Sequence, residues 1–140
     1  MDVVAETSNS TSRWEDLPVK YLILIYSNPE SRALWDTFPA DQRAQGLAAY
    51  EALDQELTES GELVVSEALD DPAKAKRVHL TEGRTLTTDG PFAEVKEYLV
   101  GFYLVDCANA DRAVEIAAKV PEAFMGLVEV RPVTDLAALA

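Results

Sequence analysis

The chain has 140 residues, of which 48% are hydrophobic and 26% are charged, which fits one globular domain with a buried core. Its 25 acidic and 12 basic residues give a net charge of −13. Because so negative a surface repels nucleic-acid phosphates and anionic lipids, we expect no nucleic-acid and no membrane binding, and the charge favours either simple solubility or a basic protein partner.

The N-terminal segment, residues 1–17, is polar apart from Trp14, and we expect a disordered lead. We expect the folded domain at residues 18–134 and a short tail at 135–140. No apolar run is long enough to cross a bilayer, and no basic segment followed by a hydrophobic stretch opens the chain. We therefore expect a cytoplasmic protein.

The first half of the chain predicts a strand followed by helices. Residues 19–26 are a continuous apolar run of β-branched and aromatic residues, typical of a central strand covered on both faces. A short helical turn is expected at 31–38. An amphipathic helix then begins at Pro39 and ends at Gly61. Its apolar residues recur at helical spacing and are Leu47, Tyr50, Leu53 and Leu57.

The second half predicts three further strands, a hairpin and a helix. The strands are expected at 63–69, 98–105 and 127–133, and the hairpin at 76–80 and 84–88. Asn109 can cap the second helix, and Pro121 ends it. The resulting order predicts an α+β fold, the ferredoxin-like β-α-β-β-α-β plan with an inserted hairpin and both helices on one side of the sheet.

Two helices can cover only one face of this sheet. The strands at 19–26 and 98–105 are nevertheless apolar on both faces, so the second face needs a cover. A second copy of the chain is the simplest cover, which predicts a homodimer.

Metal and thiol chemistry have few candidate residues. Cys107 is the single cysteine and His79 the single histidine, so one chain can form neither a disulfide nor a zinc-type ligand set. We expect Cys107 to be a partly buried structural thiol and His79 an exposed edge residue, with a haem ligand at His79 as the weaker alternative. We expect no cofactor and no metal.

Residues 87–94 place an Asp-Gly-Pro turn between a β-branched strand and an aromatic residue. This stretch resembles the signature of the DGPF group of YCII-related proteins, and the resemblance covers residues 19–133. It implies a dimeric α+β barrel, in which two sheets pack face to face and leave a cleft. The wider superfamily includes small isomerases, lyases such as dehydrochlorinases, and haem-binding proteins. DGPF members are often encoded beside extracytoplasmic-function sigma factors, which implies a regulatory or stress context.

Asp89 is the leading catalytic candidate. Gly90 permits backbone conformations barred to other residues, and Pro91 fixes its own torsion. Such a turn holds the Asp89 carboxylate in one place, which suits a general base. The alternative is that Asp89 accepts backbone N–H bonds and only stabilises the turn.

Two further residues complete the predicted site. Tyr50 stands at the helix position where the YCII branch has a proposed catalytic histidine, and a phenol there could donate a proton but is a poor base at neutral pH. Arg131 could bind a substrate carboxylate with its planar fork. The alternatives are that Tyr50 is a core residue with a bonded hydroxyl and that Arg131 pairs with Glu129 or across the dimer.

Two functions follow from these candidates. The first is a small proton-transfer enzyme of isomerase or lyase type, with Asp89 as base, Tyr50 as donor and Arg131 as substrate anchor. Its cleft would lie near the dimer interface and take a small acidic or aromatic ligand. The alternative is a non-catalytic regulatory or protein-binding module linked to a sigma factor or stress response.

Overall fold

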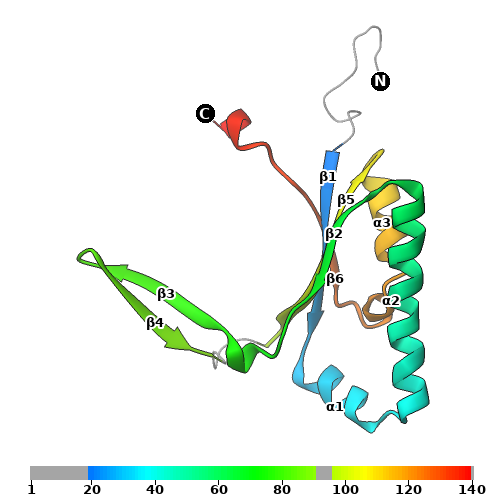
Figure 1. The fold of residues 1–140 in the computed structure, drawn as a ribbon, viewed down its shortest axis with the longest axis horizontal. Coiled ribbons are helices and arrows are strands. Elements are labelled where there is room, and N and C mark those ends of the chain that lie inside the picture. Colours follow the sequence, from blue (N-terminus) through cyan, green and yellow to red (C-terminus); the bar gives the residue numbers. More distant parts are fainter. Residues whose placement is uncertain (1–18, 91–95, 140) are drawn as a thin grey trace, which may run out of the picture.

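The computed structural model describes residues 19–90 and 96–139, which form a four-stranded sheet, a separate hairpin and helices (Figure 1). The sheet strands are β1 (Val19–Ser27), β2 (Leu63–Ala68), β5 (Tyr98–Cys107) and β6 (Val128–Pro132), and the hairpin strands are β3 (Lys76–Thr81) and β4 (Arg84–Asp89). The α-helices are α1 (Pro29–Thr37), α2 (Ala40–Ser60) and α3 (Ala110–Ala117). Short 3-10 helices are η2 (Pro72–Lys74), η3 (Pro121–Met125) and η4 (Leu136–Leu139).

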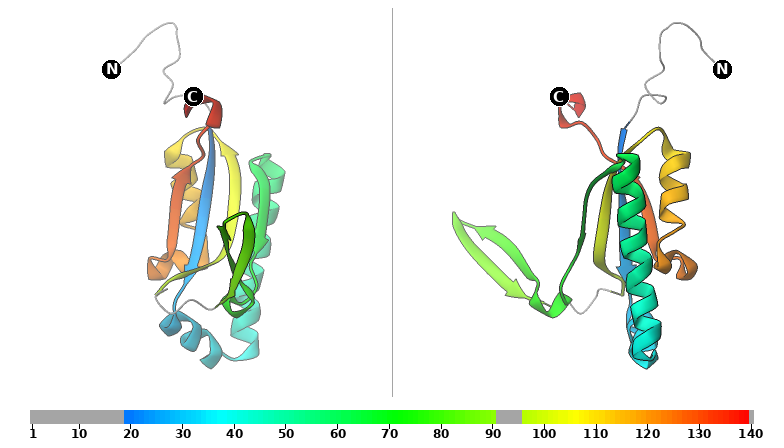
Figure 2. Two further views of the ribbon diagram at one scale, coloured as in Figure 1. Left: turned by 90° about the vertical axis from the view of Figure 1, so that its left-hand side faces the viewer. Right: turned by 45° about the vertical axis from the view of Figure 1, so that its right-hand side comes forward.

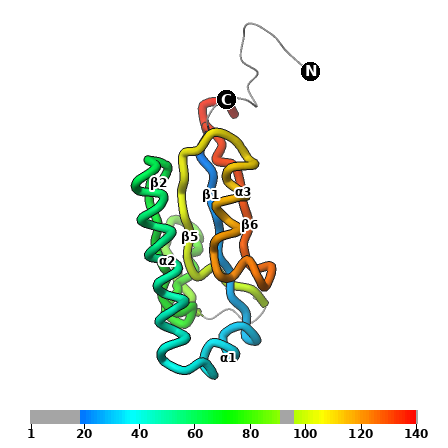
Figure 3. Tube along the Cα trace, turned by 90° about the vertical axis from the view of Figure 1, so that its right-hand side faces the viewer, coloured from blue at the N-terminus to red at the C-terminus, as the bar shows by residue number. Residues whose placement is uncertain are grey.

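The sheet is antiparallel with the order β2-β5-β1-β6, and α2 and α3 lie on the same face of it (Figure 3). The hairpin projects on the opposite side (Figures 1 and 2). This is the predicted ferredoxin-like α+β fold with an inserted hairpin. The lead at 1–17, with Trp14, and the signature residues 91–94 lie outside the described residues.

Helix boundaries differ from the prediction in two places. The expected turn at 31–38 is a full helix, α1, because the Asn28 side chain accepts a hydrogen bond from the Ser31 N–H at 2.7 Å and Pro29 suits the first turn. Helix α3 already ends at Ala117, and Pro121 instead begins η3. The second difference matters, because η3 forms one wall of the site described below.

The hydrophobic core lies between the sheet and the two helices. Alternate residues of β1, Tyr21, Ile23 and Ile25, face α2 and α3 and belong to this core. The largest fully buried side chains are Ile23, Leu57, Ile116, Val105 and Val120. Each such side chain contributes roughly 1.5–3 kcal/mol relative to an exposed one, so this layer holds the helices on the sheet.

The other sheet face has no helix over it in the described part of the chain (Figure 2). Leu22 and Leu24 of β1 point to this open face, where they pair with Leu104 and Phe102 of β5. Leu22, Leu104 and Phe102 are half-buried, although no second layer covers them. We call this surface the open sheet face. It confirms that the central strands are apolar on both sides.

The hairpin owes its shape to its turn and its base. Glu82 and Gly83 both have positive φ, 50° and 75°, the backbone of a type I′ turn. At the base, the Gly90 N–H donates to the Ala75 carbonyl at 2.8 Å. A Cβ on Gly90 would lie 2.4 Å from the Pro72 carbonyl oxygen, and the φ of Gly90 is not positive. The signature glycine is therefore required for close backbone approach, which corrects the expectation of an unusual backbone conformation.

One ion pair ties α3 to the segment between α2 and β2. Arg112 donates to both carboxylate oxygens of Glu62, from Nε at 2.9 Å and from Nη2 at 2.7 Å. The Glu62 side chain is 17% exposed, so solvent screens this pair less than a surface pair. Hydrogen bonding to Arg112 holds the pKa of the Glu62 carboxyl below its usual value.

We expect Glu62→Gln to lower the free energy of unfolding by about 1 kcal/mol at pH 7, because the bond to Arg112 loses its ionic character. The folded-state pKa of Glu62 is depressed, so the stabilisation is present above the unfolded value near 4.5 and is lost as pH falls through the folded pKa. Urea unfolding of both proteins at pH 7 and pH 3 should therefore show a smaller difference at pH 3.

The control for this prediction is Glu51→Gln, at an exposed position of α2. It should change the unfolding free energy by less than about 0.5 kcal/mol at either pH. A Glu62→Gln difference of equal size at both pH values would contradict the ionic explanation.

Candidate functional site

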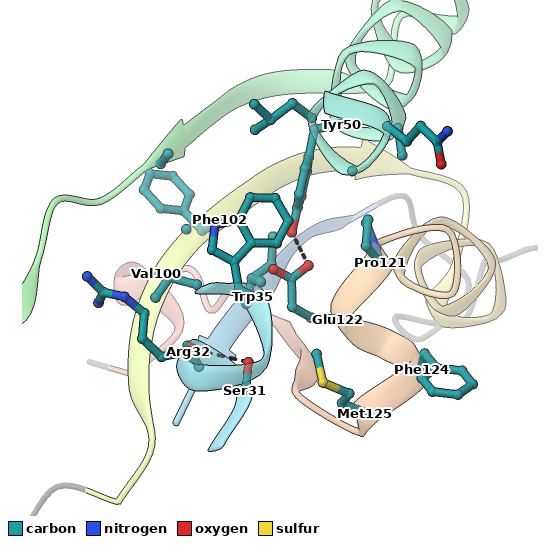
Figure 4. Close-up of a pocket in the computed structure, with 18 of the residues that line it drawn as sticks. Ser31, Arg32, Trp35, Tyr50, Val100, Phe102, Pro121, Glu122, Phe124 and Met125 are labelled. Carbon is teal, nitrogen blue, oxygen red and sulfur yellow. Dashed lines mark hydrogen bonds between the residues drawn. The ribbon is translucent and has the colours of Figure 1, made fainter. Parts of the chain in front are cut away.

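A cleft of about 900 Å³ opens on the helix side of the sheet, between α1, α2, η3 and the strands β2 and β5 (Figure 4). The same sheet side holds the core, but the cleft lies toward the end at which α1 and the start of α2 are found. Six aromatic residues contribute to its lining, namely Trp35, Phe38, Tyr50, Phe102, Tyr103 and Phe124. A volume and lining of this kind suit a small, largely apolar molecule.

Trp35 is held by close packing on both sides. Its ring lies edge-on to Phe38, with the ring centroids 6.0 Å apart at an interplanar angle of 61°. Gly46 faces it from α2, and a Cβ at that position would come within 3.3 Å of the indole ring. The glycine therefore leaves room for the indole against the helix.

A tyrosine and a carboxylate meet inside the cleft. The Tyr50 hydroxyl, from α2, donates a hydrogen bond to the Glu122 carboxylate, from η3 (Figure 4). Burial raises the pKa of the Tyr50 phenol far above its ordinary value, and the bond to Glu122 and its charge raise it further. Tyr50 therefore keeps its proton at neutral pH and serves as a hydrogen-bond donor.

A second tyrosine and carboxylate lie beside the first pair. Tyr103, from β5, is 3% exposed, and burial together with its hydrogen bond to Asp54 raises the pKa of its phenol. Asp54 also accepts a hydrogen bond from the Ser66 hydroxyl at 3.2 Å. Asp54 follows Tyr50 by one helical turn on α2, so both pairs face the same cleft.

The charged lining of the cleft is mostly acidic. Its carboxylates are Asp54, Glu67 and Glu122, and Arg32 is the one basic side chain among the described lining residues. Arg32 donates to Asp71, outside the lining, at 3.1 Å. Its side chain is 50% exposed, so it can turn toward a ligand. An acidic ligand would have this one cation to bind in the cleft.

The three residues predicted to form the site are not brought together within one chain. Tyr50 lines the cleft, whereas Asp89 and Arg131 are not among its lining residues. Asp89 ends β4 on the exposed hairpin and accepts a bond from Lys76 Nζ at 2.7 Å. Arg131, 68% exposed on β6, lies 3.4 Å from Glu129. The roles of Asp89 and Arg131 in catalysis stay predictions.

The other two singled-out residues lie apart from the cleft. His79 is exposed on β3, and Cys107 is a buried thiol whose pKa is raised by burial. Among the described residues, no three His, Cys, Asp or Glu side chains group closely enough to bind a metal ion. No described helix has the length and apolar character needed to cross a membrane.

Several residues of the cleft were not predicted from the sequence to belong to a site. Asp54 could have been found, because it lies four positions after Tyr50 on a predicted helix. Glu122 gave no such signal, since its position depends on how η3 packs beside α2. Trp35 and Arg32 fell in a segment that was expected to be a single turn.

Comparison with known proteins agrees with this fold. The YCII-related domain matches residues 19–137, a range that includes every described strand and α-helix. An uncharacterised protein of Rhizobium meliloti (strain 1021) is 33% identical over 114 residues, which is 80% of this chain and 90% of the relative. The chain belongs to the family of YCII-related domain proteins.

Proposed function

We propose that this protein is a proton-transfer enzyme of isomerase or lyase type that acts on a small aromatic ligand in the cleft. The observation that carries the proposal is the hydrogen bond from Tyr50 to Glu122 inside an aromatic-walled cavity of about 900 Å³. A carboxylate paired with a protonated phenol supplies a base and a donor at one place.

The chemistry follows from the single proton of the Tyr50 hydroxyl. When a ligand carbonyl or hydroxylate oxygen takes this hydrogen bond in place of Glu122, the carboxylate of Glu122 is released. It can then remove a proton from a neighbouring carbon of the ligand, while Tyr50 stabilises the charge that develops on the ligand oxygen. Return of the proton to another carbon gives an isomerase, and departure of a leaving group gives a lyase.

Asp89 and Arg131 need a second copy of the chain to take part in this chemistry. We propose that two copies pack their open sheet faces together, because Leu22, Leu104 and Phe102 lie there without a covering layer. In such a homodimer Asp89 is a second candidate base beside Glu122, and Arg131 is the candidate carboxylate anchor, provided that the partner brings them to a cleft. Acidic as well as neutral aromatic ligands belong to the same proposal through Arg131 or Arg32.

The alternative is a non-catalytic regulatory or protein-binding module. Two observations favour it: the net charge of −13, which suits a basic partner, and the phenol at Tyr50, which cannot replace a histidine as a base. Under this alternative the cleft would bind no ligand or bind one without proton exchange. Proton exchange therefore separates the two functions.

We expect Glu122→Gln to abolish proton exchange and Tyr50→Phe to weaken ligand binding about tenfold, the value of one hydrogen bond to the ligand. A thermal-shift screen of phenols, aryl ketones and aromatic carboxylates would first identify a ligand. Proton NMR in D₂O would then follow deuterium incorporation into its carbon positions. Glu115→Gln, at an exposed glutamate of α3 outside the cleft, is the control and should behave as the wild type.

Unchanged exchange in Glu122→Gln would contradict the role of Glu122. If exchange is lost in Asp89→Asn and retained in Glu122→Gln, the base is Asp89. If every variant binds and none of them, nor the wild type, exchanges a proton, the binding module is the better description.

We expect Leu104→Asp to weaken the homodimer at least about a hundredfold, because a buried interface centre tolerates no unpaired charge. Sedimentation velocity over a range of concentrations measures the dissociation constant. Val114→Asp is the matched control, since Val114 is 56% exposed on α3, away from the open sheet face. A wild-type protein that is monomeric at micromolar concentration would refute the dimer.

A further inference from the structure

The β3–β4 hairpin is exposed along almost its whole length. Its strands pair with each other and form a sheet of two, separate from the main sheet. Every residue of the two strands is exposed except Thr81, which is half-buried. Because an isolated two-stranded hairpin is marginally stable in water, we expect a further surface to stabilise this one.

The apolar side chains of the hairpin are unusually accessible. Val78 is 66% exposed and Leu80 is 68% exposed. In the antiparallel register they are opposite Thr87 and Thr85, which places all four side chains on one face of the hairpin. We call this the Val78–Leu80 face. Its outer part carries Leu80 and the β-branched Val78, Thr85 and Thr87, and the ion pair of Lys76 with Asp89 lies at its base.

The base of the hairpin fixes its direction. Gly90 and Ala75 close it with a backbone hydrogen bond of 2.8 Å, and the tight approach of Gly90 to Pro72 leaves no room for a side chain. Asp71, next to that base, is bound to Arg32 of α1 at 3.1 Å. The hairpin therefore projects from an anchored root, on the same side of the sheet as the open sheet face (Figures 1 and 2).

The charge of the hairpin is opposite to that of the rest of the chain. Residues 76–89 carry three basic residues, Lys76, Arg77 and Arg84, against the two acidic residues Glu82 and Asp89. The whole chain has 25 acidic and 12 basic residues, so 23 acidic and nine basic residues lie outside the hairpin. A second copy of this chain thus offers the hairpin a surface of complementary charge.

We propose that the β3–β4 hairpin is an arm that packs its Val78–Leu80 face on a second copy of the chain. The inference rests on the proposed homodimer. Two copies joined through their open sheet faces place each hairpin beside the other copy, since the hairpin projects on that side. Two-fold symmetry makes the contact reciprocal, so each chain both gives and receives an arm.

The test compares hairpin and control variants of the full chain. Val78→Thr/Leu80→Thr places a β-branched residue at both positions and removes apolar contact area, so the hairpin itself should persist. We expect the dimer dissociation constant to rise at least about tenfold in sedimentation velocity, as for loss of two packed aliphatic side chains from an interface. Val114→Thr, at the exposed position on α3, should leave the constant unchanged.

Amide hydrogen exchange supplies a measurement that needs no hairpin variant. In the wild-type dimer the amides of residues 76–89 should exchange at least about tenfold more slowly than in a monomeric Leu104→Asp protein, because docking suppresses opening of the hairpin. Dilution of the wild type below its dissociation constant should remove the same protection.

The outcomes separate this inference from the dimer itself. A wild-type protein that is monomeric would refute both the arm contact and the homodimer. A wild-type dimer whose constant is unaffected by Val78→Thr/Leu80→Thr, and whose hairpin exchanges as fast as in the monomer, overturns the arm and leaves the dimer standing. Protection of the hairpin that requires anionic lipid vesicles or another protein also overturns it, because the second copy would then not be its occupant.

Discussion

The structure depends on one constraint: its central strands are apolar on both faces, and the helices of the described residues cover one face only. Ile23 and Ile25 of β1 point to the helix side, where they are buried, and Leu22 points to the open side. The helix side becomes the core and, at one end, the cleft. On the open side no second layer formed by the described residues covers the apolar side chains, and the hairpin projects on that side.

The fold was predictable because its signals are local and repeated. Residues 19–26 and 98–105 have a continuous apolar pattern, and Asn109 and Gly61 are helix boundary residues whose preference has a local cause. The hairpin turn at Glu82-Gly83 was equally visible, since a glycine there permits the positive φ that the turn needs. Such features depend on a few neighbouring residues, so sequence alone contains them.

The site was only partly predictable, because it is assembled from distant segments. Tyr50 was found through a resemblance, but its partner Glu122 lies 72 positions away and meets it through the packing of η3. Asp89 was chosen for its rigid turn. Gly90, which follows Asp89, is bonded to Ala75 and lies close to Pro72 at the root of a projecting hairpin, and Asp89 is not among the lining residues of the cleft. The direction in which a hairpin projects from a sheet cannot be predicted from a local sequence pattern.

The phenol at Tyr50 also changes the acid–base character of the cleft. A histidine would titrate near pH 6.5 and could exchange a proton at neutral pH in either direction. Burial and Glu122 instead raise the pKa of Tyr50, so its phenol stays protonated throughout the physiological range. Tyr103 is shifted in the same direction by burial and Asp54. In the proposed reaction a carboxylate of the cleft would therefore carry the proton, and the two tyrosines would act as hydrogen-bond donors. Under this proposal the base and the hydrogen-bond donor are two different residues, whereas one histidine can combine both roles.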